Sequence, residues 1–506
     1  MAPQRGTTHV VQDNEIAAQR ENGVPGNSSG GTDMIRPGRL TRKTVALSVG
    51  RGAGVAAQFA LNTLLVRVVS QHDFGWFHEI RVVLTFAALL DLGIPLGLLQ
   101  VAGAAEPGRR HDLYRTALAI AGAAGLATGA ILFLVGFIPA FPGLSSAFAW
   151  SGLLIAATIV AAVLESALVV EDRHAAIAAI SAISALGGLA LALVGVLWRP
   201  SISVAYAALA LAACARAVAL AKVTGVAWTG VQWRPLAGAG QLLKTSIAVS
   251  GHRALGIASG TIDRAVVGIF FSAGTLGWYV TGAWEVPFMS VFFSAIASAI
   301  LPEMSAHWTA KRNADVLAVW HRSITLSAWL IFPIWLWSWI WAPELLRVLF
   351  TRQYEDGLPV FRIYLLALPV RIAVYSSLLV AMGRSRVLVN GAVIDVAVNL
   401  VLSVVLAAAI GPLGPAVATV VATYVQAGYY VASVQGELRT ERVGFFPWGS
   451  LFWALTGAGL VTLPTLVLRR VFEGDLPRAG IALAWTGGTL AVGAFLALRK
   501  RGPDRE

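Results

Sequence analysis

Several ionisable side chains lie inside apolar stretches of this sequence that are long enough to cross a membrane. The stretch from Leu242 to Ser305 shows this most clearly, because its two apolar runs contain His252, Arg253, Asp263, Arg264 and Glu285. A charge at that depth is costly, so it usually faces a polar cavity or a charged partner. These residues are therefore candidates for a binding or coupling site.

Basic side chains in these runs could hold an anion, because a guanidinium donates paired hydrogen bonds to phosphate oxygens. Arg51 lies near the start of the first run and Arg253 near the start of the seventh, so the two could form an anion-attracting vestibule. The alternative is that they reach out to lipid headgroups. For Arg264 the alternative is an interhelical ion pair with Glu79. The substrate-binding candidates are Arg51, Arg81, His252, Arg253, Arg264 and Arg371.

Acidic side chains in the same runs are candidates for coupling groups, since a buried carboxylate favours its protonated form and could exchange a proton. Asp263 and Glu285 are the coupling candidates. A salt bridge to Asp395 is the simpler interpretation of Arg371. Asp91, Glu165 and Arg216 lie toward the ends of their runs and are interpreted as structural.

The overall composition indicates the elements that position these residues. The chain has 506 residues, of which 57% are hydrophobic and 13% are charged, whereas about a quarter of a soluble domain is charged. Repeated apolar runs of about 20 residues predict an all-α polytopic membrane protein. The net charge of +12 comes mostly from loops on one side, as membrane orientation requires, so no nucleic-acid partner is expected. Cys214 alone can form no internal disulfide or multi-cysteine metal site, and no metal or cofactor is expected.

The apolar runs predict about fourteen transmembrane helices, at residues 44–68, 77–101, 116–138, 148–170, 175–197, 202–222, 243–271, 276–301, 322–345, 358–382, 387–410, 413–434, 448–468 and 479–498. Both termini are expected in the cytoplasm. Residues 303–321 read as an interfacial amphipathic helix with Trp308, Val316, Leu317 and Trp320 toward lipid. The predicted domains are a disordered cytoplasmic tail (1–41), an N-terminal lobe (42–222), a cytoplasmic linker (223–241), a C-terminal lobe (242–435), and two further helices with a cytoplasmic tail (436–506).

The two lobes look like copies of one bundle. Lys43-Thr44 and Gly50-Arg51 match Lys244-Thr245 and Gly251-His252. Farther along, Phe74-Gly75-Trp76-Phe77 matches Leu276-Gly277-Trp278-Tyr279. Six spans separate the copies, so the lobes have the same orientation and are related by a pseudo-twofold axis along the membrane normal.

A series of short motifs extends over nearly the whole chain: Asp73-Phe74-Gly75-Trp76-Phe77, Asp91-Leu92-Gly93, Asp263-Arg264, Gly277-Trp278-Tyr279, Leu301-Pro302-Glu303, Ala342-Pro343-Glu344, Tyr354, Asn399 and Gly411-Pro412-Leu413-Gly414. This series resembles the polysaccharide-transporter (oligosaccharide flippase) branch of the multidrug/oligosaccharidyl-lipid/polysaccharide exporter superfamily. The resemblance implies two six-helix lobes around a central cavity that opens alternately to each side of a bacterial inner membrane. It also implies a lipid-linked oligosaccharide as cargo, moved to the outer leaflet for exopolysaccharide, capsule or O-antigen assembly, with polymerase and export machinery as further candidate partners.

Two departures from the family pattern are informative. The lipid II flippase branch has a further basic residue where this chain has Ala57, which argues against a peptidoglycan precursor as cargo. The family often has Phe-Gly where this chain has Phe350-Thr351, so the unusual backbone geometry of that turn is expected to be supplied elsewhere.

Two other functions are alternatives to a flippase. A membrane glycosyltransferase or polymerase would need acid/base groups on a substantial outer loop, and no outer loop is long, so no enzymatic activity is expected. An organic-cation antiporter of the same superfamily would need acidic residues in the cavity of the N-terminal lobe. The first span contains no acid, and its charged residues are Arg51 and Arg67.

Overall fold

The computed structural model describes the backbone of residues 37–499, apart from residues 140, 142, 226–237, 284–288, 439–441 and 473. It describes side chains over residues 52–489, with further gaps at 107, 248–249, 252, 289–291, 294, 442–443 and 468–469. Every regular element in this part of the chain is helical, which confirms the all-α prediction. By its contacts the chain divides into residues 1–46 and a compact unit of residues 47–506. The contacts described below lie within the second unit.

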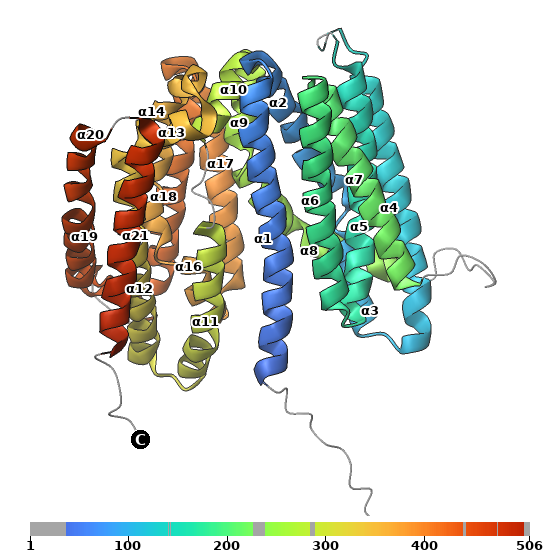
Figure 1. The fold of residues 1–506 in the computed structure, drawn as a ribbon. Helices are drawn as coiled ribbons and strands as arrows, with labels where there is room; N and C mark the ends of the chain where they lie inside the picture. Colours follow the sequence, from blue (N-terminus) through green and yellow to red (C-terminus); the bar gives the residue numbers. More distant parts are fainter. Residues whose placement is uncertain are drawn as a thin grey trace, which may run out of the picture. The chain divides into compact units, whose positions relative to one another are not determined.

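The first half of this unit contains the helices up to residue 224, shown from blue to green in Figure 1. They are α1 (Pro37–Val68, which begins in the first unit), α2 (Gln71–Ala87), η1 (Ala88–Asp91), α3 (Ile94–Gly103), α4 (Pro107–Val135), α5 (Ser145–Val170), α6 (His174–Trp198) and α7 (Ile202–Thr224). Helix α4 packs against α5, helix α6 packs against α7, and α5 packs against α7.

The second half and the helices that follow it extend from residue 239 to residue 499. They are α8 (Ala239–Ser259), α9 (Ile262–Phe270), α10 (Ala273–Gly282), α11 (Met289–Thr309), α12 (Asn313–Ile340), α13 (Ala342–Phe350), η2 (Arg352–Gly357), α14 (Leu358–Leu365), α15 (Leu368–Arg371), α16 (Tyr375–Ala381), α17 (Ser385–Ile410), α18 (Leu413–Gln435), η3 (Arg442–Phe445), α19 (Trp448–Thr462), η4 (Leu463–Val467), α20 (Leu468–Val471) and α21 (Asp475–Arg499). Figure 1 shows α17 beside α18, a pair that makes extensive contact.

Ten helical stretches of the described residues are long and apolar enough to cross a membrane. They correspond to ten of the fourteen predicted spans. The other four predicted spans are 44–68, 243–271, 276–301 and 479–498, and the count of fourteen stays a prediction. The predicted span 243–271 is divided into α8 and α9, because Gly260 and Thr261 interrupt the helix. Such breaks are invisible to hydropathy, since the residues on both sides remain apolar.

Segments that match in the internal repeat lie against each other where α2 meets α10. A Cβ atom on Gly75 would lie 1.7 Å from the carbonyl oxygen of Ala273, and one on Gly277 would lie 2.6 Å from that of Gln71. The repeat relates Gly75 to Gly277 and Gln71 to Ala273, so the contact is reciprocal, as a twofold axis requires. It joins the first half of the chain to the second.

The two halves also meet where α3 packs against α8. A Cβ atom on Gly93 would lie 1.9 Å from Oγ of Ser250, and one on Gly97 would lie 2.0 Å from Oγ of Ser246. Because α2 and α3 form one membrane-crossing stretch, residues 71–103, the halves are in contact near both of its ends.

The prediction that residues 303–321 form one interfacial helix with Val316 and Trp320 toward lipid was wrong. The segment contains the end of α11, a turn at residues 310–312 and the start of α12. Val316 and Trp320 are fully buried, and Nε1 of Trp320 donates to the carbonyl oxygen of Ala373 at 2.6 Å. The amphipathic pattern arises because these apolar side chains face other helices of the protein.

The expectation that another residue supplies the unusual backbone at Phe350-Thr351 was also wrong. Thr351 itself takes a φ of 68° between α13 and η2. Its Oγ1 atom is buried and has no hydrogen-bond partner among the described residues. A β-branched residue is strained at positive φ, a conformation that glycine adopts without a steric cost.

Candidate functional site

A cavity of about 880 Å³ lies within the first half of the chain, among helices α1, α2, α3, α5, α6 and α7, and Ile257 of α8 also contacts it. Its wall is mainly apolar. The polar side chains that line the cavity include Gln58, Arg81, Glu165, Ser181, Tyr206 and Arg216. Arg81 and Arg216 are the cations of this lining and Glu165 is its acid, so the wall carries a net positive charge.

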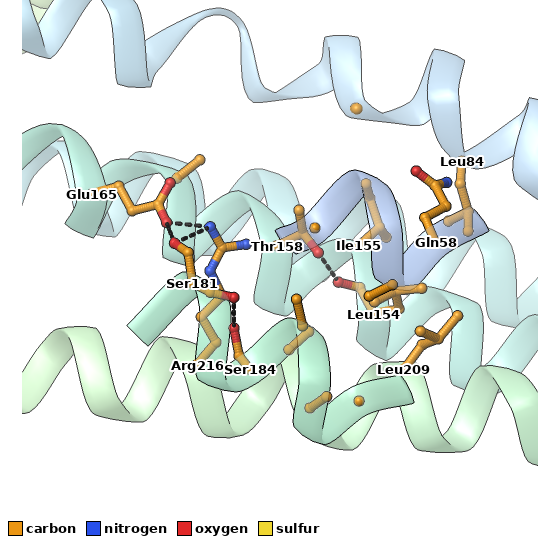
Figure 2. A pocket seen from close by; sticks show the side chains of 18 of the residues that line it. Gln58, Leu84, Leu154, Ile155, Thr158, Glu165, Ser181, Ser184, Leu209 and Arg216 are labelled. Carbon is orange, nitrogen blue, oxygen red and sulfur yellow. Dashed lines mark hydrogen bonds and ion pairs between the residues drawn. The ribbon is translucent and has the colours of Figure 1, made fainter. Parts of the chain in front are cut away.

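Three helices contribute to the polar cluster formed by Glu165, Ser181 and Arg216. Nη2 of Arg216 on α7 forms an ion pair with Oε1 of Glu165 on α5 and donates to Oγ of Ser181 at 3.3 Å. Oγ of Ser181 on α6 donates to the same Glu165 oxygen at 3.2 Å. Figure 2 shows the three side chains converging on one another at the cavity wall. The cluster is partly open to the cavity, because the Arg216 and Glu165 side chains are 30% and 26% exposed.

Arg81 is the predicted substrate-binding residue that lines this cavity. Its neighbour in the wall is Tyr206, which is buried and donates its phenolic hydrogen to the carbonyl oxygen of Phe77 at 2.6 Å. The Arg81 guanidinium forms no ion pair with the side chains that the structure describes. It therefore carries an uncompensated positive charge at the cavity wall, where it could bind an anion.

Arg253, another predicted substrate-binding residue, forms an ion pair where the halves meet. Its Nη1 atom lies 2.6 Å from Oδ2 of Asp91, whose other oxygen accepts from the backbone N–H of Gly93 at 2.8 Å. The Asp91 side chain is 4% exposed and that of Arg253 is 33% exposed. Asp91 thus compensates the charge of Arg253 in this conformation, and substrate binding by Arg253 stays a prediction.

The predicted residues Asp263 and Arg264 lie on α9, which contacts α2, and they are not among the residues that line the cavity. Asp263 is buried, and its Oδ2 atom accepts hydrogen bonds from the hydroxyls of Tyr279, at 3.1 Å, and Tyr364. Arg264 donates to the carbonyl oxygens of Ala283, at 2.9 Å, and Gly260, at 3.5 Å. The coupling role of Asp263 and the substrate-binding role of Arg264 stay predictions.

A second polar cluster surrounds Asp395 on α17. The carboxylate accepts from the hydroxyl of Ser259, while the amide oxygen of Asn399 accepts from the hydroxyls of Ser403, at 3.0 Å, and Thr419, at 3.3 Å. The positive charge of Arg371 interacts electrostatically with the Asp395 carboxylate. The predicted salt bridge between these two residues, and substrate binding by Arg371, stay predictions.

The remaining predicted residues lie outside the described side chains. The backbones of Arg51 and His252 belong to α1 and α8, but their side chains are not described, and neither is any part of Glu285. Their predicted roles are therefore unchanged.

The sequence prediction missed the polar cluster in the cavity wall. The sequence favours a structural role for Glu165 and Arg216, and it gives no signal for Gln58 or Ser181. One signal for these residues is present in the sequence. Glu165 and Arg216 have opposite charges and lie within separate apolar runs, which usually indicates an ion pair or a polar cavity. The sequence alone does not show that the two helices turn these side chains toward the same space.

Comparisons with known proteins give a family and a fold. A family model described as "Polysaccharide biosynthesis protein" matches residues 64–359. The "Probable low-salt glycan biosynthesis flippase Agl15" of Haloferax volcanii is 29% identical over 215 residues, which are 40% of this chain and 44% of that protein. The chain thus matches less than half the length of this curated relative.

Solved structures with a similar fold are transporters. One is the lipid II flippase MurJ in an inward closed conformation (TM-score 0.72, 13% identity, 91% of this chain and 99% of that chain). Another is a MOP superfamily transporter from Pyrococcus furiosus (TM-score 0.55, 12% identity, 79% and 95%). A third is the Vibrio cholerae MATE transporter VcmN (TM-score 0.53, 15% identity, 81% and 98%). At such low identities the likeness establishes the fold alone.

Proposed function

Because this chain belongs to the polysaccharide biosynthesis protein family, we propose that it is a flippase for a lipid-linked glycan. The observation that carries the proposal is the cavity among membrane-crossing helices with the uncompensated charge of Arg81 in its wall. The similarity to a probable glycan biosynthesis flippase supports the same class of cargo.

The size and charge of the cavity suit a polyprenyl-pyrophosphate headgroup that carries sugar. A volume of about 880 Å³ is within the range of about 300–1,000 Å³ that is typical of small-molecule sites. The headgroup would enter the cavity while its lipid tail stays in the bilayer. The net positive wall favours an anionic group, and Arg81 can donate paired hydrogen bonds to its phosphate oxygens.

Transport requires the cavity to open toward each side of the membrane in turn. In this structure the halves are in contact through α2 and α10 and again through α3 and α8. Separation of α3 from α8 would break the Asp91–Arg253 pair and leave Arg253 available for the incoming pyrophosphate. We propose that the side of the protein where α3 meets α8 faces the cytoplasm, as do both chain termini. We further propose that the membrane is a bacterial inner membrane and that the pathway is exopolysaccharide, capsule or O-antigen assembly. Asp263 and Glu285 are the proposed coupling residues.

An organic-cation antiporter is the second candidate, because MATE transporters share the fold. A cation would need an acid in the cavity. The acid among the described cavity residues is Glu165, and its charge is compensated by Arg216. The cavity therefore fits an anionic cargo better than a cationic one, and we propose transport rather than catalysis as its function.

Deletion of the gene tests this proposal. Lipid-linked glycans should then accumulate in the cytoplasmic leaflet, where they are accessible in inside-out vesicles and protected in right-side-out vesicles. The wild-type gene should restore outward transport, and a variant with Arg81→Ala should not. Unchanged outward appearance of every lipid-linked glycan would contradict the proposal, and increased sensitivity to organic cations in its place would favour the antiporter.

A further inference from the structure

We propose that the cluster of Glu165, Ser181 and Arg216 is the sugar-recognition site of the cavity and binds neighbouring hydroxyls of one sugar of the glycan. This inference rests on the proposed flippase function and adds to it a division of the cavity between the sugar and the pyrophosphate. It assigns a binding role to an ion pair that would otherwise only join α5 to α7.

The position of the cluster differs from that of an ion pair that only stabilises packing. Both charged side chains keep more than a quarter of their surface exposed and line the cavity. Nε of Arg216 is buried and has no hydrogen-bond partner among the described residues. Protein groups therefore do not satisfy the cluster completely, and an unsatisfied buried donor calls for an explanation.

The chemistry of the cluster fits hydroxyl groups. A carboxylate accepts hydrogen bonds, a guanidinium donates them, and a serine hydroxyl does both. Neighbouring hydroxyls of a sugar ring likewise donate and accept, so one ring can satisfy Glu165 and Arg216 together. A phosphate can only accept at neutral pH and would be repelled by the Glu165 carboxylate.

Apolar residues separate this cluster from the other polar part of the cavity. Figure 2 shows Leu154, Ile155 and Thr158, whose hydroxyl donates to the carbonyl oxygen of Leu154 at 2.7 Å, between the cluster and the part of the cavity wall that contains Gln58 and Leu84. Arg81 precedes Leu84 by three residues on α2, so the two lie on one face of that helix. Arg81 thus lies in the part of the cavity that includes Leu84, where the pyrophosphate would bind. The Glu165–Arg216 pair lies in the other part, which would receive the sugar.

The test compares binding of citronellyl diphosphate with binding of its conjugates to glucose, galactose or N-acetylglucosamine, using the purified full-length protein in nanodiscs. The wild type should bind at least one conjugate about ten-fold more tightly than the sugarless compound, because a hydrogen bond to a charged group contributes about that factor. Ser181→Ala should reduce this preference. The double variant Glu165→Arg with Arg216→Glu should abolish it, since the exchange keeps an ion pair but reverses the arrangement of donors and acceptors.

Ser203→Ala is the matched control, because it removes a serine hydroxyl that bonds to Ser146 outside the cavity lining, with an oxygen–oxygen distance of 2.8 Å. It should leave the preference unchanged. Preservation of the preference in Ser181→Ala and in the charge exchange would overturn the inference and leave the pair a structural one. Equal binding of all four compounds by the wild type would overturn the inference alone. Failure of the wild type to bind any of them would overturn the proposed function as well.

Discussion

The reciprocal contact between α2 and α10 gives a sharp prediction for Gly75→Ala. The added Cβ atom would lie 1.7 Å from the carbonyl oxygen of Ala273 and 2.4 Å from its carbonyl carbon. Both are backbone atoms, so no rotation of a side chain can relieve the clash and the two helices must separate. Overpacking of this kind costs about 1–3 kcal/mol, which should lower the population of the closed contact about 5- to 150-fold.

The labelling rate of a cysteine at Ala273 measures how often this contact opens. The site is suitable because Ala273 is only 7% exposed, so a membrane-impermeant maleimide reaches it when the helices part. Cys214, the one native cysteine, is first replaced by alanine. Gly75→Ala should raise the labelling rate by the factor given above.

Gly122→Ala on α4 is the matched control, because a Cβ atom there would meet nothing within 4 Å. It should leave the labelling rate at Ala273 unchanged. If Gly75→Ala labels at the control rate and unfolds at the same temperature as the control, the two halves do not meet at this contact, and the reasoning is refuted.

Two further predictions concern Asp91 and Thr351. Asp91→Asn removes the charge that pairs with Arg253, which should weaken the contact between α3 and α8 by about 1.5–3 kcal/mol. A cysteine introduced at Ser246, which is fully buried, should then react faster with a maleimide. An unchanged labelling rate would show that the ion pair does not hold this contact closed. Thr351→Gly should raise the thermal unfolding temperature of the protein in detergent. Relief of the backbone strain at φ 68° contributes about 1–3 kcal/mol, which exceeds the entropic cost of glycine, about 0.5–1 kcal/mol. A lower unfolding temperature would show that Thr351 is not strained.

The positions of most helices could be predicted from the sequence, because a run of apolar residues long enough to cross a membrane satisfies its backbone only as a helix. The internal repeat was also visible, and the structure places its matching glycines, Gly75 and Gly277, against each other. The interruptions at Gly260–Thr261, at residues 366–367 and at residues 372–374 could not be predicted from hydropathy, because the residues around them stay apolar.

The candidate site was predictable only in part. The cost of burying charge singled out the ionisable residues, and Arg81 does line the cavity. Their partners could not be inferred, because pairing depends on how each helix is rotated about its axis and on which helices become neighbours. Asp91 and Arg253 are 162 residues apart, and Glu165 and Arg216 are 51 residues apart. The sequence pattern does not show that the two residues of either pair are close in space.

Reconstitution of the purified protein in liposomes tests the central claim most directly. A fluorescent polyprenyl-pyrophosphate-linked glycan is incorporated in both leaflets, and a membrane-impermeant quencher is added outside. With the wild-type protein, quenching should extend to the glycan that begins in the inner leaflet, whereas Arg81→Ala should restrict it to the outer leaflet, as in protein-free liposomes. Inner-leaflet glycan that stays protected with the wild-type protein, or that Arg81→Ala moves equally well, would contradict the account.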